Sequence, residues 1–225
     1  METKIKLRPY EPPAISPLYW SFWRRVLKRT LDIAGAGVGL LALAPLFLLI
    51  SAAVKLTSRG PVFFKHTRIG RYRLPVHVLK FRTMVRDGDA ILERHLLLNP
   101  QLKMEWEEKR KLRGDPRVTR IGRTLRKFSL DELPQLWNVF IGDLSLVGPR
   151  PVTQDELSRF GPSTHALLAV RPGVTGLWQV NGRNDVTYEE RAALELRYVR
   201  EWSLLLDIRI ILRTIPSVFR GAGAY

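Results

Sequence analysis

The longest apolar stretch of the chain runs from Ile33 to Val54 and contains no charged residue. At about 22 residues it is long enough for a helix that reaches across the core of a bilayer, which takes about 20 residues. It lies too deep in the chain, and is too long, for the apolar part of a cleavable signal peptide. We therefore expect a membrane helix that remains in the mature protein.

Basic residues flank this apolar segment on both sides. They are Arg24, Arg25, Lys28 and Arg29 before it, and Lys55, Arg59, Lys65 and Arg68 after it. Because positive flanks stay on the cytoplasmic side of a membrane, two basic flanks favour both ends on that side. Pro45 removes a helix hydrogen bond and can turn the segment back. We predict a re-entrant helix hairpin that breaks near Pro45, with a spanning helix and a tolerated proline as the alternative.

Strand and helix patterns alternate after the membrane segment. Residues 61–65 and 76–82 are rich in aromatic and β-branched residues and predict two strands, joined by a turn around Gly70. Residues 88–112, rich in Leu, Glu and Lys, predict one or two surface helices. Residues 155–160 predict another helix. These elements give a β-hairpin followed by a largely helical region.

The C-terminal third continues this mixture. Residues 170–183 predict turns with a short strand, and Thr187 with Glu190 forms a capping box that opens a helix reaching about Trp202. From Trp202 to Phe219 the chain is apolar, with two arginines one helical turn apart. That pattern is typical of a helix at a membrane interface, although a buried core helix explains it equally well.

These elements predict an α+β fold: a mostly helical, membrane-associated globular domain with a short β-hairpin, anchored by an N-terminal re-entrant membrane helix hairpin and by interfacial amphipathic helices. We expect an irregular or surface-lying arm at 1–23, the membrane helix at 24–58 and a cytoplasmic domain at 59–225.

Charge narrows the range of partners. The chain has 37 Lys and Arg residues, 21 Asp and Glu residues and a formal net charge of +16. This balance favours nucleic acid, an acidic lipid headgroup or a phosphorylated substrate. The absence of cysteine excludes disulfides and thiolate metal sites. The four histidines, His66, His77, His95 and His165, show no metal-ligand spacing.

The segment Ser129-Leu130-Asp131-Glu132-Leu133-Pro134 places two adjacent carboxylates ahead of the turn Gly148-Pro149-Arg150-Pro151. Basic residues that can pair with phosphate oxygens surround them: Arg117, Arg120, Arg123, Arg126, Lys127 and Arg150. An ionised Asp-Glu pair can supply both a nucleophile and a ligand for a divalent metal. Ser129 and Glu132 also match a capping box, which would give them only a structural role. A helix dipole and the arginines would favour ionised Asp131.

Several motifs, in this order, resemble those of the bacterial sugar transferase family, the monotopic polyprenyl-phosphate hexose-1-phosphate transferases. They are Lys80-Phe81-Arg82-Thr83-Met84, Asp115-Pro116-Arg117-Val118-Thr119, Ser129-Leu130-Asp131-Glu132-Leu133-Pro134-Gln135-Leu136-Trp137-Asn138, Ser145-Leu146-Val147-Gly148-Pro149-Arg150-Pro151 and Gly176-Leu177-Trp178-Gln179-Val180-Asn181-Gly182-Arg183. The resemblance runs from about Lys28 to the C-terminus. It is strongest to members that initiate exopolysaccharide synthesis with galactose or glucose.

The resemblance implies transfer of a hexose 1-phosphate from a UDP-sugar to undecaprenyl phosphate, with release of UMP, in a ping-pong reaction. It implies that Asp131 is the nucleophile on the β-phosphorus and that Glu132 binds Mg²⁺. Substrate contacts are implied for Lys80, Arg82, Arg126, Arg150, Gln179 and Arg183, the last of them in the uridine pocket. Pro45 is implied to break the membrane helix, although Ala44 stands where the family often has a serine.

The resemblance also implies a setting and partners. It makes 59–225 a catalytic sugar transferase domain on the cytoplasmic face of the bacterial inner membrane, in contact with membrane lipid. No nucleic acid is expected, and a homodimer stays open. Two other functions also stay open: a membrane-anchored basic scaffold or nucleic-acid-binding protein, in which the arginines contact a phosphate backbone, and a metal-assisted phosphatase. Nothing in the residues selects the sugar.

Overall fold

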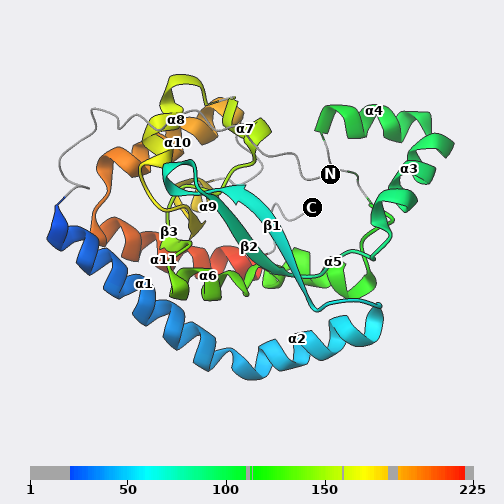
Figure 1. Cartoon of the computed structure of the whole chain (residues 1–225), viewed down its shortest axis with the longest axis horizontal. Helices are drawn as coiled ribbons and strands as arrows, with labels where there is room; N and C mark the ends of the chain where they lie inside the picture. Colours follow the sequence, from blue (N-terminus) through cyan, green and yellow to red (C-terminus); the bar gives the residue numbers. More distant parts are fainter. Residues whose placement is uncertain (1–20, 110–111, 113, 159, 182–186, 221–225) are drawn as a thin grey trace.

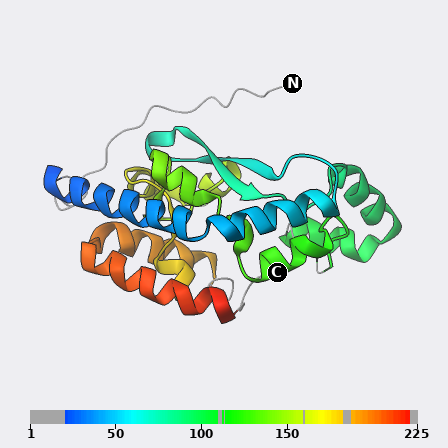
Figure 2. The ribbon, with the colours of Figure 1, turned by 90° about the horizontal axis from the view of Figure 1, so that it is seen from below.

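The computed structural model describes residues 21–109, 112, 114–158, 160–181 and 187–220. Two helices, α1 (Phe22–Ala42) and α2 (Ala44–Thr57), follow each other along one side of the molecule, and the other elements lie on one side of this pair (Figure 1). Figure 2, a view from that side, shows both helices crossing in front of the rest of the chain. The predicted arm at 1–20 lies outside the described residues.

The two helices meet at Leu43 and are bent by 62°. Pro45 lies in the first turn of α2, where a missing N–H leaves no helix carbonyl unpaired. None of the described helices is by itself long and apolar enough to cross a membrane, but α1 and α2 together have that length and composition. The break therefore comes two residues before Pro45, and the re-entrant path stays a prediction.

The predicted hairpin is confirmed. Strands β1 (Phe63–Ile69) and β2 (Pro75–Phe81) pair in antiparallel fashion, with Phe63 opposite Phe81 at the open end. At the tip, Tyr72 and Arg73 have φ angles of 57° and 63°, the left-handed region that bulky residues seldom adopt. The residues that follow form two helices, α3 (Gly88–Leu98) and α4 (Pro100–Lys109), which project to one side of the molecule (Figure 1).

The chain between α4 and α10 forms short elements. They are α5 (Arg120–Lys127), the 3₁₀ turn η2 (Leu130–Glu132), α6 (Gln135–Ile141), α7 (Gln154–Ser158), the 3₁₀ turn η3 (Gly161–Ser163), α8 (Thr164–Leu168) and α9 (Leu177–Val180). Two three-residue strands, β3 (Ser145–Val147) and β4 (Gly173–Thr175), pair in parallel. The sequence patterns missed β3, α5, α6, α8 and the short α9, since runs this brief show little periodicity.

Two longer helices close the fold. Helix α10 (Tyr188–Glu201) opens with the predicted capping box: Glu190 N–H donates to Thr187 Oγ1, and Glu190 accepts from the Thr187 N–H. Helix α11 (Leu204–Arg220) buries Asp207 and Ile210 against the core. Together with the hairpin, these elements confirm a mostly helical α+β fold.

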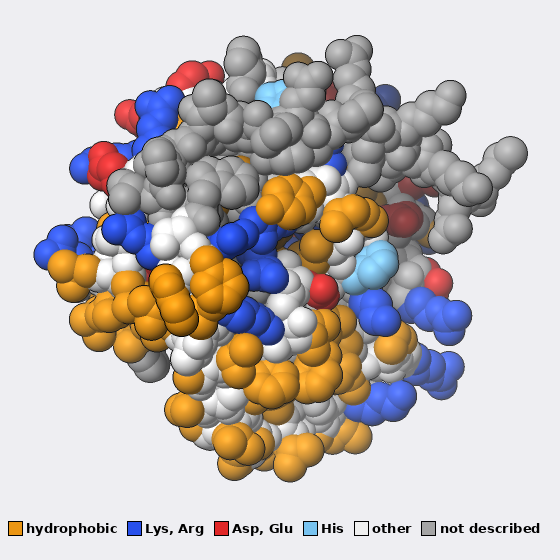
Figure 3. Space-filling view, turned by 60° about the vertical axis from the view of Figure 1, so that its left-hand side comes forward, with side chains coloured by type: hydrophobic (Ala, Val, Ile, Leu, Met, Phe, Trp, Pro, Cys, Tyr) orange, Lys and Arg blue, Asp and Glu red, His pale blue; other side chains and the backbone are white. Residues whose placement is uncertain are grey.

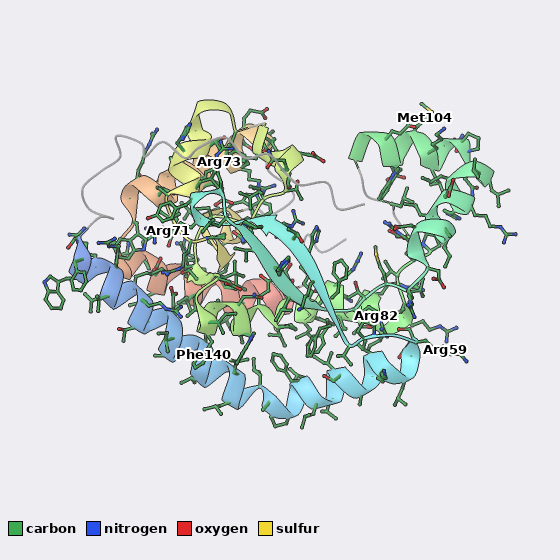
Figure 4. The ribbon with its side chains drawn as sticks, in the orientation of Figure 1. Arg59, Arg71, Arg73, Arg82, Met104 and Phe140 are labelled. Carbon is green, nitrogen blue, oxygen red and sulfur yellow. The ribbon has the colours of Figure 1, made fainter. Side chains whose placement is uncertain are left out.

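Helix α11 also keeps an apolar face on the surface, and so do α1, α2 and α6. The exposed residues are Phe22, Trp23, Leu27, Val38, Leu41, Leu48, Leu49, Leu56, Trp137, Phe140, Ile141, Leu205, Ile208, Leu212 and Ile215. In Figure 3 hydrophobic side chains gather along the lower part of the surface, at the level that α1 and α2 occupy in Figure 1. Phe140 points from α6 toward α1 (Figure 4), where a Cβ on Gly37 would lie 3.6 Å from its ring. Helix α11 thus packs one face against the core and exposes an apolar face, and its place at a membrane interface stays a prediction.

A buried ion cluster joins α1 to this core. Lys28 Nζ lies 2.7 Å from Asp207 Oδ2 and 3.3 Å from Asp32 Oδ1, and it donates to the Val147 carbonyl at 3.0 Å. Tyr198 donates to Asp207 Oδ1 and Trp202 Nε1 to Asp207 Oδ2. Although the sequence placed Lys28 in a basic flank beside the membrane, its side chain is only 7% exposed and its charge is used inside the protein.

Arg29, the neighbour of Lys28, holds the C-terminal end of α6. Its guanidinium donates to the carbonyls of Val139 at 2.6 Å and Phe140 at 2.8 Å. Helix C-terminal carbonyls lack partners within the helix, and a cation there interacts favourably with the helix dipole. The start of α1 is therefore fastened both to the core and to the helix that follows η2.

We predict that Lys28→Met destabilises the protein by about 3–5 kcal/mol, because it leaves the carboxylates of Asp32 and Asp207 buried without their counter-ion. Denaturant unfolding in detergent measures the change. Arg25→Met, on the exposed side of the same helix, is the control and should change stability by no more than about 0.5 kcal/mol. Equal stability of the two variants would show that the ion cluster does not hold α1 to the core.

Candidate active site

A cavity of about 940 Å³ opens between the end of the hairpin, α5, η2 and α9. Its volume suits a sizeable ligand. Seven of the eight residues predicted to bind substrate or act in catalysis line it: Lys80, Arg82, Arg126, Asp131, Glu132, Arg150 and Gln179. The eighth, Arg183, lies outside the described residues. The fold thus brings segments that are far apart in the sequence to one cavity.

The two carboxylates lie on η2, and no capping box forms there. Ser129 has a left-handed backbone, with φ of 53°, and its side chain makes no capping hydrogen bond. Glu132 does not return to the amide of Ser129 but pairs with Lys80, with Nζ 2.5 Å from Oε1. The structural alternative for Ser129 and Glu132 is therefore wrong, because a long-range ion pair replaces the local hydrogen bonds.

Lys80 lies beside both acids. Its Nζ is 4.0 Å from Asp131 Oδ2 as well as 2.5 Å from Glu132 Oε1. Strand β2 carries Lys80, and its pairing with β1 fixes the position of the amine at the edge of the cavity. One lysine thus lies within 4.0 Å of both neighbouring carboxylates.

The two carboxylates differ in acidity. Burial raises the pKa of Asp131 to about 6, even though the charges of Lys80 and Arg126 act to lower it. For Glu132, burial also raises the pKa, but the charges of Lys80, Arg150 and Arg68 outweigh burial and leave the pKa below its ordinary value. The charge of Arg126 thus favours ionised Asp131, as expected, but burial outweighs it and the pKa of Asp131 is raised. Pairs with separated pKa values are typical of catalytic sites.

The arginines of the basic row have different surroundings. Arg126 lines the cavity, and its Nε donates to Thr83 Oγ1 at 2.9 Å. Arg117 also reaches the cavity, but it forms a bidentate pair with Asp115, whose oxygens lie 2.9 and 2.7 Å from its nitrogens. Arg120 and Arg123 are exposed on α5 and are not among the residues that line the cavity. Among the basic residues of α5, Arg126 is the one that lines the cavity and can meet an anion.

Arg150, from the turn at Gly148 to Pro151, and Trp178 and Gln179, from α9, also line the cavity. The guanidinium carbon of Arg150 lies 5.6 Å from the centre of the Trp178 ring. The side-chain amide of Gln179 is buried and has no hydrogen-bond partner among the described residues, nor has the indole N–H of Trp178. Buried polar groups are normally satisfied. These groups are therefore available to a ligand with donors and acceptors.

The side chain of Arg82 borders the cavity, and its guanidinium also holds the backbone nearby. Its guanidinium donates to the carbonyls of Ser58 and Pro61 and to Ser58 Oγ, where α2 ends and the hairpin begins. Figure 4 shows Arg82 at this end of α2. These bonds give Arg82 a structural role, because the C-terminal carbonyls of α2 need donors, and the predicted substrate contact stays a prediction.

Residues that the sequence did not single out complete the cavity. His66 lines it, and burial together with the charges of Arg68, Lys80 and Arg150 lowers its pKa to about 4, so the ring is neutral at pH 7. Phe64 lines the same wall and is paired with Lys80 across the hairpin. The sequence patterns did not give the register of the hairpin, which pairs Phe64 with Lys80. Cross-strand partners point to the same face, so Phe64 and His66 lie on the face of Lys80.

The acidic pair suits a magnesium ion that arrives with its ligand. In the part of the chain that the structure describes, no group of three or more acidic or histidine side chains could hold a metal. Mg²⁺ is commonly bound by one or two carboxylates together with substrate phosphates and water. Asp131 and Glu132 supply that number of carboxylates, so the site fits a metal bound jointly with a diphosphate.

Comparison with known proteins agrees with this chemistry. The family model described as bacterial sugar transferase matches residues 23–221. The chain is 48% identical over 217 residues to the exopolysaccharide production protein ExoY of Rhizobium meliloti, covering 96% of this chain and 94% of that protein. It is 45% identical over 201 residues to the undecaprenyl-phosphate galactose phosphotransferase of Salmonella typhimurium, covering 89% of this chain and 42% of that protein.

A third relative names another sugar. The UDP-glucose:undecaprenyl-phosphate glucose-1-phosphate transferase of Caulobacter vibrioides is 41% identical over 208 residues, covering 88% of this chain and 72% of that protein. The names of these relatives agree on the type of reaction and differ in the hexose. On the family match and these identities, the chain belongs to the bacterial sugar transferase family.

Proposed function

We propose that this protein transfers a hexose 1-phosphate from a UDP-sugar to undecaprenyl phosphate and releases UMP, the step that initiates exopolysaccharide synthesis. The observation that carries the proposal is the buried Asp131 beside an ionised Glu132 in a cavity lined by Lys80, Arg126 and Arg150. Relatives that bear the names of such transferases support it. Galactose and glucose are the favoured hexoses.

In the first half-reaction, an Asp131 carboxylate oxygen attacks the β-phosphorus of the UDP-sugar. A bond forms between this oxygen and phosphorus, and the bond between that phosphorus and the oxygen bridging to the α-phosphate breaks. The bridging oxygen keeps the electron pair and leaves as part of UMP. The product is a sugar phosphate linked covalently to Asp131, as expected for nucleophilic catalysis.

In the second half-reaction, a phosphate oxygen of undecaprenyl phosphate attacks the same phosphorus. The bond to Asp131 breaks, the carboxylate is restored, and the lipid carries a diphosphate-linked hexose. A covalent intermediate lets a soluble donor and a membrane lipid use one site in turn, so the two never need to bind together. Kinetics of the ping-pong type follow.

The residues around Asp131 have separate tasks in this reaction. Mg²⁺ bound with Glu132 and the diphosphate would neutralise charge on the donor. Lys80 holds Glu132 in place and lies near Asp131, and Arg126 and Arg150 line the cavity and can pair with phosphate oxygens. Gln179 offers a buried amide to the nucleotide. Arg82 borders the cavity and also holds the end of α2.

The surface supports a site beside a membrane. The apolar faces of α1, α2, α6 and α11 are exposed, and the chain is strongly basic. We propose that α1 and α2 enter the cytoplasmic leaflet of the inner membrane as a re-entrant pair, with α11 at the interface. An anionic leaflet attracts basic segments, and a shallow position keeps the cavity near the lipid phosphate.

The two alternative functions explain less of the structure. A scaffold or nucleic-acid-binding protein would present its arginines on an open surface, whereas Arg126 and Arg150 face a cavity that also holds two carboxylates. A phosphatase would use water in place of the lipid. That function would not explain the exposed apolar faces of the helices. We expect no nucleic acid as a partner.

We predict that detergent-solubilised protein with Mg²⁺ releases UMP from UDP-galactose or UDP-glucose, and that turnover requires undecaprenyl phosphate. Asp131→Asn should lower the rate by at least about a thousandfold, because an amide is a poor nucleophile. Glu132→Gln should mainly weaken the response to Mg²⁺. Asp87→Asn, an exposed acid outside the cavity, is the matched control and should keep the wild-type rate. A near-normal rate in Asp131→Asn would exclude it as the nucleophile.

We predict that the rate of UMP release in a single turnover rises with pH around a midpoint near 6, because Asp131 must be ionised to attack and its pKa is raised to about 6. Lys80 lowers the pKa of Asp131, so Lys80→Met should move the midpoint to higher pH. Arg120→Met, on the exposed side of α5, should leave it in place. A midpoint that stays put or falls in Lys80→Met would contradict the assignment.

A further inference from the structure

Glu195 is a buried acid that the proposed reaction does not use. It lies on α10, is 1% exposed, and has the apolar residues Tyr198 and Val199 as near neighbours in the helix. Its Oε1 accepts a hydrogen bond from the backbone N–H of Arg150 at 3.0 Å. Its Oε2 has no hydrogen-bond partner among the described residues.

Stability alone does not account for such a group. Burial raises the pKa of Glu195 to about 7, although the Arg150 N–H and the charges of Arg191 and Arg150 act to lower it. A buried carboxyl with one backbone partner costs free energy that an apolar side chain of similar size would avoid. Arg191, one helical turn before it, pairs with Glu156 at 3.6 Å and acts on Glu195 through its charge.

The group that Glu195 contacts is the turn that carries Arg150. On one side this turn is fixed by β4: the N–H of Gly173 donates to the Pro149 carbonyl at 2.8 Å, and the N–H of Gly148 donates to Thr175 at 2.9 Å. The backbones are so close that a Cβ on Gly173 would lie 2.1 Å from the nitrogen of Gly148. The Gly148 end of the turn is therefore firmly held.

The Arg150 end is held differently. Behind it lies a second cavity of about 20 Å³, lined by Pro149, Arg150 and Glu195 together with apolar side chains. Packing is therefore incomplete where the turn approaches α10, and the hydrogen bond to Glu195 is the polar contact that fixes the backbone of Arg150 there. Small displacements of a group that binds substrate can reduce rates strongly.

We propose that Glu195 is a positioning residue, which holds the backbone of Arg150 so that the Arg150 side chain meets a phosphate group of the substrate in the large cavity. Glu195 itself touches no substrate and acts through Arg150. The proposal rests on the proposed function, since it assumes that Arg150 binds a phosphate of the UDP-sugar.

Kinetics of Glu195 variants test it. Glu195→Met removes the acceptor at similar size and should lower kcat/KM for the UDP-sugar by about 10–100-fold. Glu195→Gln keeps an acceptor oxygen and should stay within about threefold of wild type. Glu201→Met, an exposed acid on the same helix, is the control. If Glu195→Met does not fold, Glu195→Asp, whose carboxylate is one methylene shorter, should show the same loss.

A background of Arg150→Ala separates positioning from a merely structural role. If Glu195 acts through the Arg150 side chain, Glu195→Met should have little further effect on kcat/KM there. Wild-type kinetics in both Glu195→Met and Glu195→Asp, or the same loss with and without the arginine side chain, would overturn the proposal.

A binding measurement keeps this test separate from that of the proposed function. UDP binding, followed by tryptophan fluorescence, should weaken in Glu195→Met and in Arg150→Ala to a similar extent and stay unchanged in Glu201→Met. If the wild type released no UMP but these affinities followed this pattern, the proposed reaction would fail and the role of Glu195 would stand. Unchanged UDP affinity in Glu195→Met beside weakened affinity in Arg150→Ala would overturn the role of Glu195.

Discussion

The attachment of α1 to the core depends on one buried lysine. Lys28 meets Asp32 from its own helix and Asp207 from α11, and it also donates to the carbonyl of Val147. A buried cation with two acids is stable only if all the partners are present, which makes the cluster sensitive to the position of each helix. It fixes α1 relative to α11 and β3, and with them the apolar faces that these helices leave exposed.

The same cluster leads directly to the active site. Val147, whose carbonyl accepts from Lys28 and from Tyr198, immediately precedes the turn at Gly148 to Pro151 that carries Arg150. From there Glu195 holds the backbone and Arg150 lines the cavity. Helix α1 and Arg150 are thus linked through a few hydrogen bonds. In this arrangement the acidic pair on η2 meets basic groups that come from three other parts of the chain.

The sequence predicted those features that depend on local patterns, and it failed where long-range contacts decide. The capping box of Thr187 and Glu190 forms, but the same pattern at Ser129 and Glu132 does not, because Lys80 takes the glutamate. The hairpin, the two helices after it and α10 follow from periodicity and turn residues. The family motifs contain every predicted site residue, and those that the structure describes all line the cavity.

Burial could not be predicted from those patterns. Burial raises the pKa of Asp131. Glu195 and Lys28 are also buried, although the sequence neighbours of Lys28 suit a membrane flank. Arg82 is a further example: two residues after Lys80, it borders the cavity but donates its hydrogen bonds to the end of α2. Such contacts arise from tertiary packing, which no short window of sequence contains.

The central claim is that Asp131 carries the sugar phosphate between two substrates. Intact-protein mass spectrometry after incubation with UDP-galactose or UDP-glucose and Mg²⁺, without lipid, tests this claim most directly. The account predicts a mass increase of one hexose phosphate, located on Asp131 by peptide mapping and removed by undecaprenyl phosphate. An unmodified protein that releases UMP only when donor and lipid are present together would contradict it.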